Sequence, residues 1–184
     1  MRTLKSLSFE EANSNSQEIF NAVKGKIGMV PNLYAAMGVS DKLLGGFLSF
    51  TETLKSGELS AKEYEAVALA TSQANGCAYC LSAHTAIGKM NGLTDAETEQ
   101  NRQGLSSDEK VAAGLNFAQS VTKNRGNVSA DEIAAIKVAG YTDGDVLEIV
   151  LNVVANTLTN YVNHIAKTEI DFPEVNSGKF TINA

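Results

Sequence analysis

Residues 60–84 read SAKEYEAVALATSQANGCAYCLSAH, and this stretch predicts two helices joined by a tight turn. Ser60, with Glu63 three residues later, forms a capping box that begins a helix. Gly76 is the turn residue that ends this helix, and a second helix should begin just before Cys77. Because the connection is short, we expect the two helices to run roughly antiparallel.

Helical periodicity dominates the rest of the chain, and strand alternation is hard to find anywhere. Loops are expected from Gly25 to Pro31 and from Asn124 to Asn127. The pattern therefore predicts an all-α fold. The second helix of the hairpin should end around Asn91-Gly92. Outside the hairpin, the pattern predicts six more helices: over 32–37, from Asp41 to Gly57, from Thr94 toward Gln100, from Ser107 through Val121, from Ser129 to Gly140 and from Thr142 through Leu158.

The last of these helices is the most apolar. Apolar residues cover much of its circumference, so it must be buried on several sides, within the domain or between subunits. The tail over residues 171–184 contains Pro173 and Gly178 and has no helical pattern, so it is either a wrapping arm or loose. The apolar positions of the last helix are Val146, Leu147, Ile149, Val150, Val153, Val154 and Leu158.

Length and composition predict one domain over residues 1–184. Of the 184 residues, 43% are hydrophobic and two are proline, which is enough for one well-filled core. Fifteen basic and 21 acidic residues give a net charge of -6 without a basic cluster, which argues against nucleic acid as a partner. Because the N-terminal residues turn polar before a long apolar run develops, we expect no secretory signal, and we expect no membrane span because no segment is apolar over the required length. We expect a cytoplasmic protein with no membrane partner, in which thiols stay reduced unless they are cycled.

Both cysteines of the chain lie in the short motif Cys77-Ala78-Tyr79-Cys80. Thiols three residues apart on a helix can close a disulfide without moving the fold, so the spacing indicates redox chemistry. A helix N-terminus carries partial positive charge, which favours a thiolate there. His84 follows Cys80 by one turn, so the two sulfurs and the imidazole should lie on one stripe of the helix.

Glu65 has apolar neighbours in the preceding helix, which predicts that its side chain is buried. Burial raises the pKa of a carboxyl group toward the range in which it exchanges protons near neutral pH. Glu65 lies about ten residues before the turn and His84 about nine after it, so the two side chains should face each other. We hypothesise that they hydrogen-bond, directly or through water, and that His84 takes the proton of a neighbouring cysteine. The alternative is a surface Glu65 that reaches solvent or pairs with a lysine such as Lys62.

Other uses of a Cys-x-x-Cys pair fit this sequence less well. A closed zinc site needs four ligands, and the remaining histidine, His164, lies in a different predicted helix. Attachment of a c-type haem needs a histidine directly after the second cysteine, where this chain has Leu81. A thioredoxin-like site would follow a strand. We expect neither a metal nor a cofactor, and two inert packing cysteines stay open as an alternative.

Glu65, Cys77-x-x-Cys80 and His84, placed on two helices, resemble the active-site motif of the alkylhydroperoxidase D family within the carboxymuconolactone decarboxylase-like superfamily. The flanks resemble its longer, peroxidase-related members. This resemblance implies an all-α, alkylhydroperoxidase D-like helical domain that forms a homo-oligomer, commonly a trimer or hexamer. The flanking segments are Gly28-Met29-Val30-Pro31-Asn32-Leu33, Thr159-Asn160-Tyr161-Val162-Asn163-His164 and Asp171-Phe172-Pro173.

The resemblance also implies a metal-free thiol peroxidase that reduces organic hydroperoxides or hydrogen peroxide. By analogy, Cys80 attacks the terminal oxygen and becomes a sulfenic acid, and Cys77 resolves it to a disulfide. Glu65 and His84 relay the proton, and a dithiol, such as a dihydrolipoyl group on a partner protein, restores the thiols. The resemblance implies decarboxylase activity less strongly than peroxidase activity, because simple carboxymuconolactone decarboxylases lack the cysteine pair. The residues alone leave open which sulfur attacks, because the helix start favours Cys77 as the thiolate.

Tyr79 departs from the family pattern, because alkylhydroperoxidase D proper has a histidine directly before the later cysteine. A phenol with an ordinary pKa near 10 can donate a hydrogen bond but cannot act as a base at neutral pH. We expect His164 to be a satisfied core or interface histidine rather than part of the site. Two other functions stay open: a thiol-disulfide exchange protein or redox sensor without peroxidase turnover, and a helical oligomer with a vestigial site.

Overall fold

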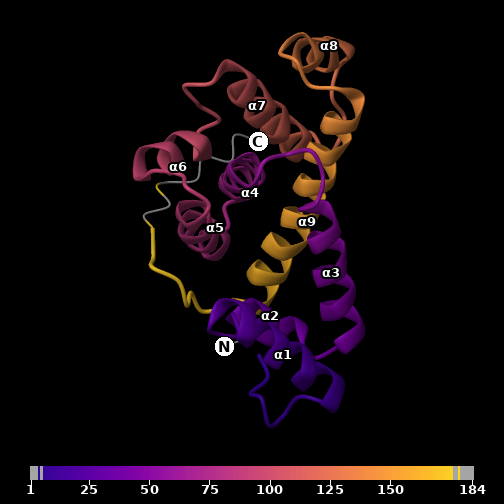
Figure 1. The fold of residues 1–184 in the computed structure, drawn as a ribbon, viewed down its shortest axis with the longest axis vertical. Helices are drawn as coiled ribbons and strands as arrows, with labels where there is room; N and C mark the ends of the chain where they lie inside the picture. Colours follow the sequence, from indigo (N-terminus) through magenta and orange to yellow (C-terminus); the bar gives the residue numbers. More distant parts are fainter. Residues whose placement is uncertain (1–3, 5, 176–177, 179–184) are drawn as a thin grey trace.

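Helices make up the regular structure of the protein (Figure 1). The computed structural model describes residues 4, 6–175 and 178, and over these residues it contains nine helices and no strand. The predicted all-α fold is confirmed. The helices are α1 (Ser14–Ile27), α2 (Asn32–Met37), α3 (Asp41–Leu54), α4 (Ala61–Asn75), α5 (Ala78–Met90), α6 (Asp95–Arg102), α7 (Glu109–Lys123), α8 (Ala130–Val138) and α9 (Asp143–Ala166).

The hairpin of α4 and α5 forms as predicted. Ser60 and Glu63 complete the capping box, and Gly76 ends α4 in the left-handed conformation, with φ 70°. A left-handed φ favours glycine because a Cβ atom would be strained there. Cys77 was expected in the first turn of α5, but it is the N-cap residue, and its Sγ accepts a hydrogen bond from the amide of Cys80. The side chain that caps the helix is therefore also one of the two thiols.

The structure also differs from the prediction at α1 and at the start of α7, and α9 continues to Ala166, beyond Leu158. Residues 14–27 form α1, which the sequence did not reveal, so the loop expected from Gly25 starts only after this helix. Asn13 caps α1 by accepting an amide hydrogen bond, and a glycine costs only about 1 kcal/mol within a helix. The N-cap of α7 is Asp108 rather than Ser107, because the Asp108 carboxylate accepts hydrogen bonds from two amides of the first turn.

The central helix is α4, and α5, α6, α7 and α9 pack against it (Figure 1). Residues 64–72 of α4 are all buried. Several of them are small, and Ala66, Ala68 and Ala70 are at most 1% exposed. Small side chains let neighbouring helices approach the backbone of α4 closely. The same packing places Glu65 inside the protein.

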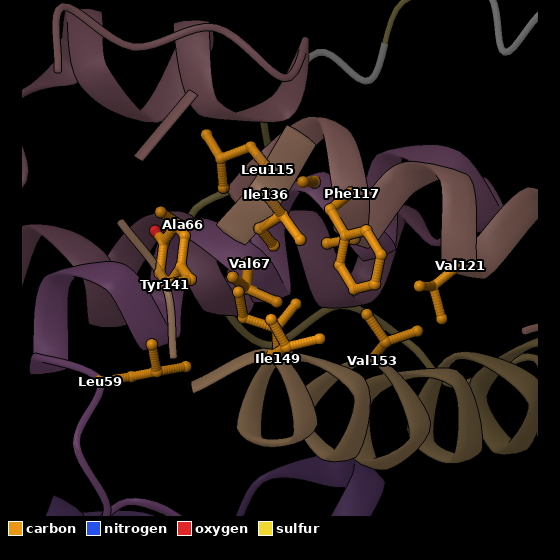
Figure 2. Packing of buried hydrophobic residues seen from close by; sticks show 13 residues of the cluster. Leu59, Ala66, Val67, Leu115, Phe117, Val121, Ile136, Tyr141, Ile149 and Val153 are labelled. Carbon is orange, nitrogen blue, oxygen red and sulfur yellow. The ribbon is translucent and has the colours of Figure 1, made fainter. Parts of the chain in front are cut away.

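Two apolar clusters hold the helices together. The larger one has thirteen buried residues from α4, α7, α8, α9 and the adjoining loops, and their side chains interdigitate (Figure 2). The second cluster joins α1, α2 and α3 to the start of α5, and it contains Cys77, Tyr79 and Cys80. Burial of a large apolar side chain stabilises a fold by about 1.5–3 kcal/mol. The cysteine pair is therefore part of a packed core.

One face of α9 is polar and buried, whereas the opposite face is apolar and exposed. Four buried asparagines, Asn152, Asn156, Asn160 and Asn163, lie on the inner face. Six apolar residues on the outer face are between 38% and 63% exposed, so within the single chain this helix is not buried on several sides. Burial between subunits, and with it the homo-oligomer, stays a prediction. The six residues are Leu147, Leu151, Val154, Leu158, Tyr161 and Ile165.

The segment after α9 wraps back over α2 and α5. The Asp171 carboxylate accepts a hydrogen bond from the Asn32 amide at 2.6 Å, and the Ser82 hydroxyl accepts one from the Val175 amide at 3.3 Å. Residues 171–175 thus form a wrapping arm, and the rest of the predicted tail, apart from residue 178, lies outside the described residues. No helix in the described part of the chain is long and apolar enough to cross a membrane.

The packing of α9 against α4 and α7 predicts a large difference between two apolar truncations. Ile149→Ala removes a fully buried side chain of the larger cluster and should lower the free energy of unfolding by about 2–5 kcal/mol. Val138→Ala, at a position that is 88% exposed, should change it by less than about 0.5 kcal/mol. Urea unfolding monitored by circular dichroism measures both. Equal midpoints for the two variants would contradict this account of the core.

Candidate active site

The two thiols lie against each other at the N-terminus of α5. Cys77 and Cys80 are free cysteines, at most 2% exposed, and their Sγ atoms are 2.7 Å apart. The sulfur of Cys77 also accepts a hydrogen bond from the Cys80 amide, at 3.3 Å. The predicted disulfide pair is thus assembled locally by one helix turn, and its two sulfurs can join without a change of fold.

Asn163 of α9 supplies a hydrogen bond that the sequence reasoning did not assign. Its Nδ2 donates to Cys80 Sγ at 3.1 Å, and it lies 3.9 Å from Cys77 Sγ. The available signal was the spacing of the asparagines at 152, 156, 160 and 163, which places four amides on one face of an otherwise apolar helix. Amides in that pattern need partners when they are buried, and here a sulfur is one of the partners.

The two sulfurs have opposite proton affinities. Burial raises the pKa of the Cys80 thiol, but hydrogen bonds and a nearby positive charge outweigh it and lower the pKa to about 7. The hydrogen bonds come from Cys77, Asn163 and Asn160, and the charge comes from His84. For Cys77, the hydrogen bond that its thiol donates to Cys80 and its burial raise the pKa. Of the two thiols, Cys80 is therefore the one that loses its proton first, although the helix start favours Cys77.

Glu65 and His84 face each other across α4 and α5. Glu65 Oε2 and His84 Nδ1 are 2.7 Å apart, and the two side chains are 1% and 17% exposed. The predicted burial of Glu65 and its direct hydrogen bond to His84 are thus present in the structure. Because Nδ1 is engaged with the carboxylate, Nε2 is the ring nitrogen that remains to exchange a proton.

The direction of the Glu65 pKa differs from the prediction. Burial raises it, but the charge and hydrogen bond of His84 and the ammonium of Lys55 outweigh burial, so the pKa is lowered. For His84, burial lowers the pKa, but the charge and hydrogen bond of Glu65 prevail and raise it. The two groups therefore form an ion pair in which the carboxylate holds the imidazolium, and the proton is carried by His84.

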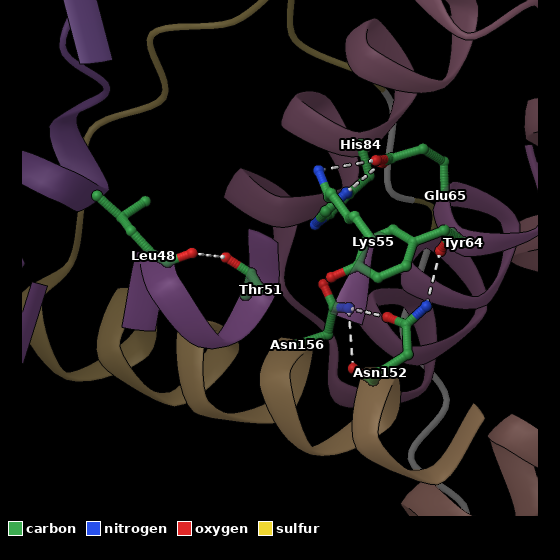
Figure 3. Close-up of polar contacts among 8 residues, drawn as sticks. All are labelled: Leu48, Thr51, Lys55, Tyr64, Glu65, His84, Asn152 and Asn156. Carbon is green, nitrogen blue, oxygen red and sulfur yellow. Dashed lines mark hydrogen bonds and ion pairs between the residues drawn. The ribbon is translucent and has the colours of Figure 1, made fainter. Parts of the chain in front are cut away.

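The lysine that reaches Glu65 is Lys55 and not Lys62. Lys55 Nζ lies 3.6 Å from Glu65 Oε1, and Figure 3 shows the contacts of Lys55 and His84 meeting at the carboxylate. Lys62 instead faces Glu97, at 3.9 Å. The alternative of a surface Glu65 is wrong, because its side chain is 1% exposed even though a lysine pairs with it.

A cavity of about 730 Å³ opens beside Cys80 and His84. Most of its lining residues are apolar or aromatic, among them Tyr34, Phe47 and Phe172, whereas Cys77 is not one of them. A cavity of this size can hold a small organic molecule. Of the two sulfurs, the one with the lower pKa is the one that such a molecule reaches.

Tyr79 anchors the surroundings of the site and cannot act as a base. Its hydroxyl accepts a hydrogen bond from the Leu33 amide at 3.3 Å, and the ring of Phe172 packs edge-on against its own, with centroids 5.9 Å apart. Burial, followed by the neighbouring Asp171 carboxylate, raises the pKa of the phenol. Tyr79 therefore connects α5 to α2 and to the C-terminal arm, and Phe172 of this arm forms part of the cavity wall.

His164 lies outside the site. It is exposed on α9, and its Nε2 is 3.3 Å from the carbonyl oxygen of Gly76. The expectation of a core histidine is wrong, and an interface position stays a prediction. Among the described residues, no three His, Cys, Asp or Glu side chains gather in a way that could hold a metal ion.

Comparisons with known proteins identify similar sequences and folds. Residues 42–117 match the carboxymuconolactone decarboxylase family. The structure of an alkylhydroperoxidase AhpD core, an uncharacterized peroxidase-related protein from Ralstonia eutropha JMP134, is similar to this chain: it is 23% identical, with a TM-score of 0.83 over 92% of each chain. An uncharacterized peroxidase-related protein from Silicibacter sp. TM1040 is 24% identical, with a TM-score of 0.78 over 89% of this chain and 90% of its own.

A third similar structure is the debrominase Bmp8, which is 19% identical, with a TM-score of 0.78 over 91% of each chain. A cysteine-to-alanine variant of this debrominase is in complex with 2,3,4-tribromopyrrole. No curated protein matches the chain. At these identities the solved structures show that the fold is shared.

Removal of the Asn163 amide should weaken the Cys80 thiolate. Asn163→Leu removes one hydrogen bond to a charged sulfur, which should raise the pKa of Cys80 by about one unit. At pH 7 the rate of alkylation by iodoacetamide should then fall about fivefold, because the thiolate fraction falls by that factor when the pKa rises from about 7. The adjacent exposed His164→Leu is the matched control and should leave the rate unchanged. Equal rates in the wild type and Asn163→Leu would exclude the amide from thiolate stabilisation.

The ion pair of Glu65 and His84 predicts a shift in the titration of the imidazole. Glu65→Gln keeps the shape of the side chain but removes the charge that stabilises imidazolium, so His84 should titrate at lower pH. The chain has two histidines, so carbon-13 NMR of labelled imidazoles resolves both, with exposed His164 as the internal control. The thiolate absorbance of Cys80 should change in the same variant. Unchanged curves for both groups would remove Glu65 from the proton path.

Proposed function

We propose that the protein is a thiol peroxidase of the alkylhydroperoxidase D type. Two findings support this premise: residues 42–117 match the carboxymuconolactone decarboxylase family, and the fold is shared with solved structures of peroxidase-related proteins. The substrates of the proposed enzyme are organic hydroperoxides or hydrogen peroxide, and Cys77 and Cys80 are its redox pair. One observation carries the proposal. The sulfur whose pKa is about 7, Cys80, lines an apolar cavity together with a histidine that a buried carboxylate holds.

In the first step, the Cys80 thiolate attacks the terminal oxygen of the hydroperoxide. The oxygen-oxygen bond breaks, the sulfur becomes a sulfenic acid, and the alkoxide leaves. His84 has accepted the proton of the Cys80 thiol and now gives it to the alkoxide, which departs as an alcohol. Glu65 stabilises the imidazolium between the two transfers and does not itself change its protonation state.

In the second step, Cys77 resolves the sulfenic acid. Its sulfur attacks the sulfur of Cys80, a disulfide forms, and water leaves with the proton of the Cys77 thiol. The raised pKa of Cys77 supports this order, because a thiol that keeps its proton does not compete for the hydroperoxide. Two electrons have then passed from the thiols to the peroxide.

An external dithiol must reduce the disulfide before the next turnover. Its two thiols become a disulfide while Cys77 and Cys80 regain their protons. By analogy with alkylhydroperoxidase D, we propose a dihydrolipoyl group on a partner protein. The apolar lining of the cavity supports this reductant, because a lipoyl arm is a narrow aliphatic chain that carries its sulfurs at the tip.

The alternative is a thiol-disulfide exchange protein or redox sensor without peroxidase turnover. Exchange with a protein partner needs an accessible sulfur, whereas Cys77 and Cys80 are at most 2% exposed. Access to Cys80 through a cavity favours a small molecule instead. Burial of the pair therefore supports the peroxidase over the sensor.

Peroxide consumption distinguishes these functions. The wild type should consume cumene hydroperoxide continuously when dithiothreitol is present, and Cys80→Ser should abolish consumption. In the absence of dithiothreitol, Cys77→Ser should reduce one equivalent and stop, because it leaves a sulfenic acid on Cys80 that dimedone traps for mass spectrometry. The trapped adduct also tests which sulfur attacks.

Three results would contradict the proposal. Stoichiometric oxidation of the wild type without turnover would favour the sensor. A dimedone adduct on Cys77 in the Cys80→Ser variant would assign the attack to the other sulfur. The compound bound by the debrominase Bmp8 variant, 2,3,4-tribromopyrrole, supplies the third test. If the protein releases bromide from it and consumes no peroxide, its substrate is a brominated aromatic compound and not a hydroperoxide.

A further inference from the structure

The buried Glu65 carboxylate has a second cationic neighbour, which the peroxidase steps do not use. This neighbour is Lys55, the residue that ends α3. Its Nζ lies 3.6 Å from Glu65 Oε1, whereas His84 occupies Oε2. Among the residues that the structure describes, no group donates a hydrogen bond to Oε1. The ammonium of Lys55 is thus the positive charge beside the carboxylate oxygen that His84 leaves free.

Lys55 differs in its placement from a solvated surface lysine. Its side chain is 50% exposed and lines the cavity that reaches Cys80. Its Nζ lies 5.0 Å from the centroid of the Tyr64 ring, so the aromatic face and the carboxylate hold the ammonium together. Figure 3 shows the side chain reaching from the end of α3 toward the carboxylate that also contacts His84.

The other charged and titratable groups near the carboxylate do not compete for it. Burial, and after it the charge of Glu65, raises the pKa of Tyr34 from α2 and of Tyr64 from α4, so both phenols stay protonated. On α5 the anionic Cys80 faces His84 rather than Glu65. Lys26 and Glu52 also line the cavity, but they pair with each other at 3.2 Å on the surface.

We propose that Lys55 is a positioning residue: by sharing the Glu65 carboxylate with His84, it sets the pH range in which the imidazole exchanges a proton with the attacking thiol. The proposal rests on the peroxidase function above. A carboxylate held by one cation stabilises imidazolium more than a carboxylate divided between two. In that function His84 accepts a proton and then returns it to the leaving oxygen, so a proton that is held too tightly slows the second transfer. In agreement, Glu65 raises the pKa of His84 while Lys55 lowers it.

Lys55→Met tests the proposal, because it removes the ammonium but keeps an unbranched aliphatic side chain. Without the Lys55 cation nearby, the protonated form of His84 is more stable, so the carbon-13 NMR titration of His84 should move to higher pH. The expected shift is roughly half a pH unit, the size for a half-exposed pair that water partly screens. Lys55→Arg keeps the charge and should restore the wild-type curve.

Two matched controls separate this charge effect from general disturbance. Lys26→Met removes another lysine of the same cavity, but one that pairs with Glu52, and should leave the titration of His84 in place. His164 lies near Gly76 at the far end of α4, about 16 Å from Glu65 along the helix, and its signal should be the same in all variants. Raised ionic strength should shrink the shift caused by Lys55→Met.

The pH profile of single-turnover peroxide reduction supplies the functional readout. Lys55→Met should move the whole profile to higher pH, and Lys55→Arg should return it. An unmoved His84 curve, a shift to lower pH, or an equal shift in Lys26→Met would overturn the proposal. If the wild type consumes no peroxide, the proposed function fails, while the His84 titration still tests whether Lys55 acts through Glu65.

Discussion

A carboxylate enclosed in a helical core needs positive partners, and Glu65 obtains them from two other segments. An unpaired buried charge costs several kcal/mol, so the most buried stretch of α4 can carry an acid only because His84 and Lys55 reach it. Its partners come from the middle of α5 and from the residue that follows α3. The apolar clusters then fill the space around the arrangement. The ion pair of the proposed active site is therefore enclosed by the same packed core that holds the helices together.

The sulfur of Cys80 is a second buried acidic group, and besides the charge of His84 its lowered pKa depends on neutral hydrogen-bond donors. Its hydrogen bonds come from the Cys77 thiol and the Asn163 amide, which are neutral. Neutral donors stabilise the thiolate without adding a charge that would disturb the Glu65 and His84 pair. Asn163 is the member of the buried asparagine face of α9 that reaches this sulfur, whereas Asn152 donates to the Tyr64 carbonyl oxygen.

Local signals predicted the elements of the site well. The capping box at Ser60 and the turn at Gly76 act over a few residues, and helical rise sets the depth of each side chain, so the contact of Glu65 with His84 followed from counting. Apolar periodicity did not reveal α1, because this helix has few apolar residues and a glycine near its end. The N-cap at Asp108 replaced the expected Ser107 because a carboxylate can accept two amide hydrogen bonds.

Taken alone, the amino-acid sequence determined every helix after α1, the turn between α4 and α5, and the stripe that holds both sulfurs and the imidazole, because capping and periodicity are properties of neighbouring residues. Only the tertiary structure decided the charges: that Lys55 rather than Lys62 meets Glu65, that the acid keeps a lowered pKa, and that Cys80 is the thiolate. A pKa depends on every group that comes close in space. The amide that supports the thiolate is 83 residues away in the chain, and no local pattern encodes that approach.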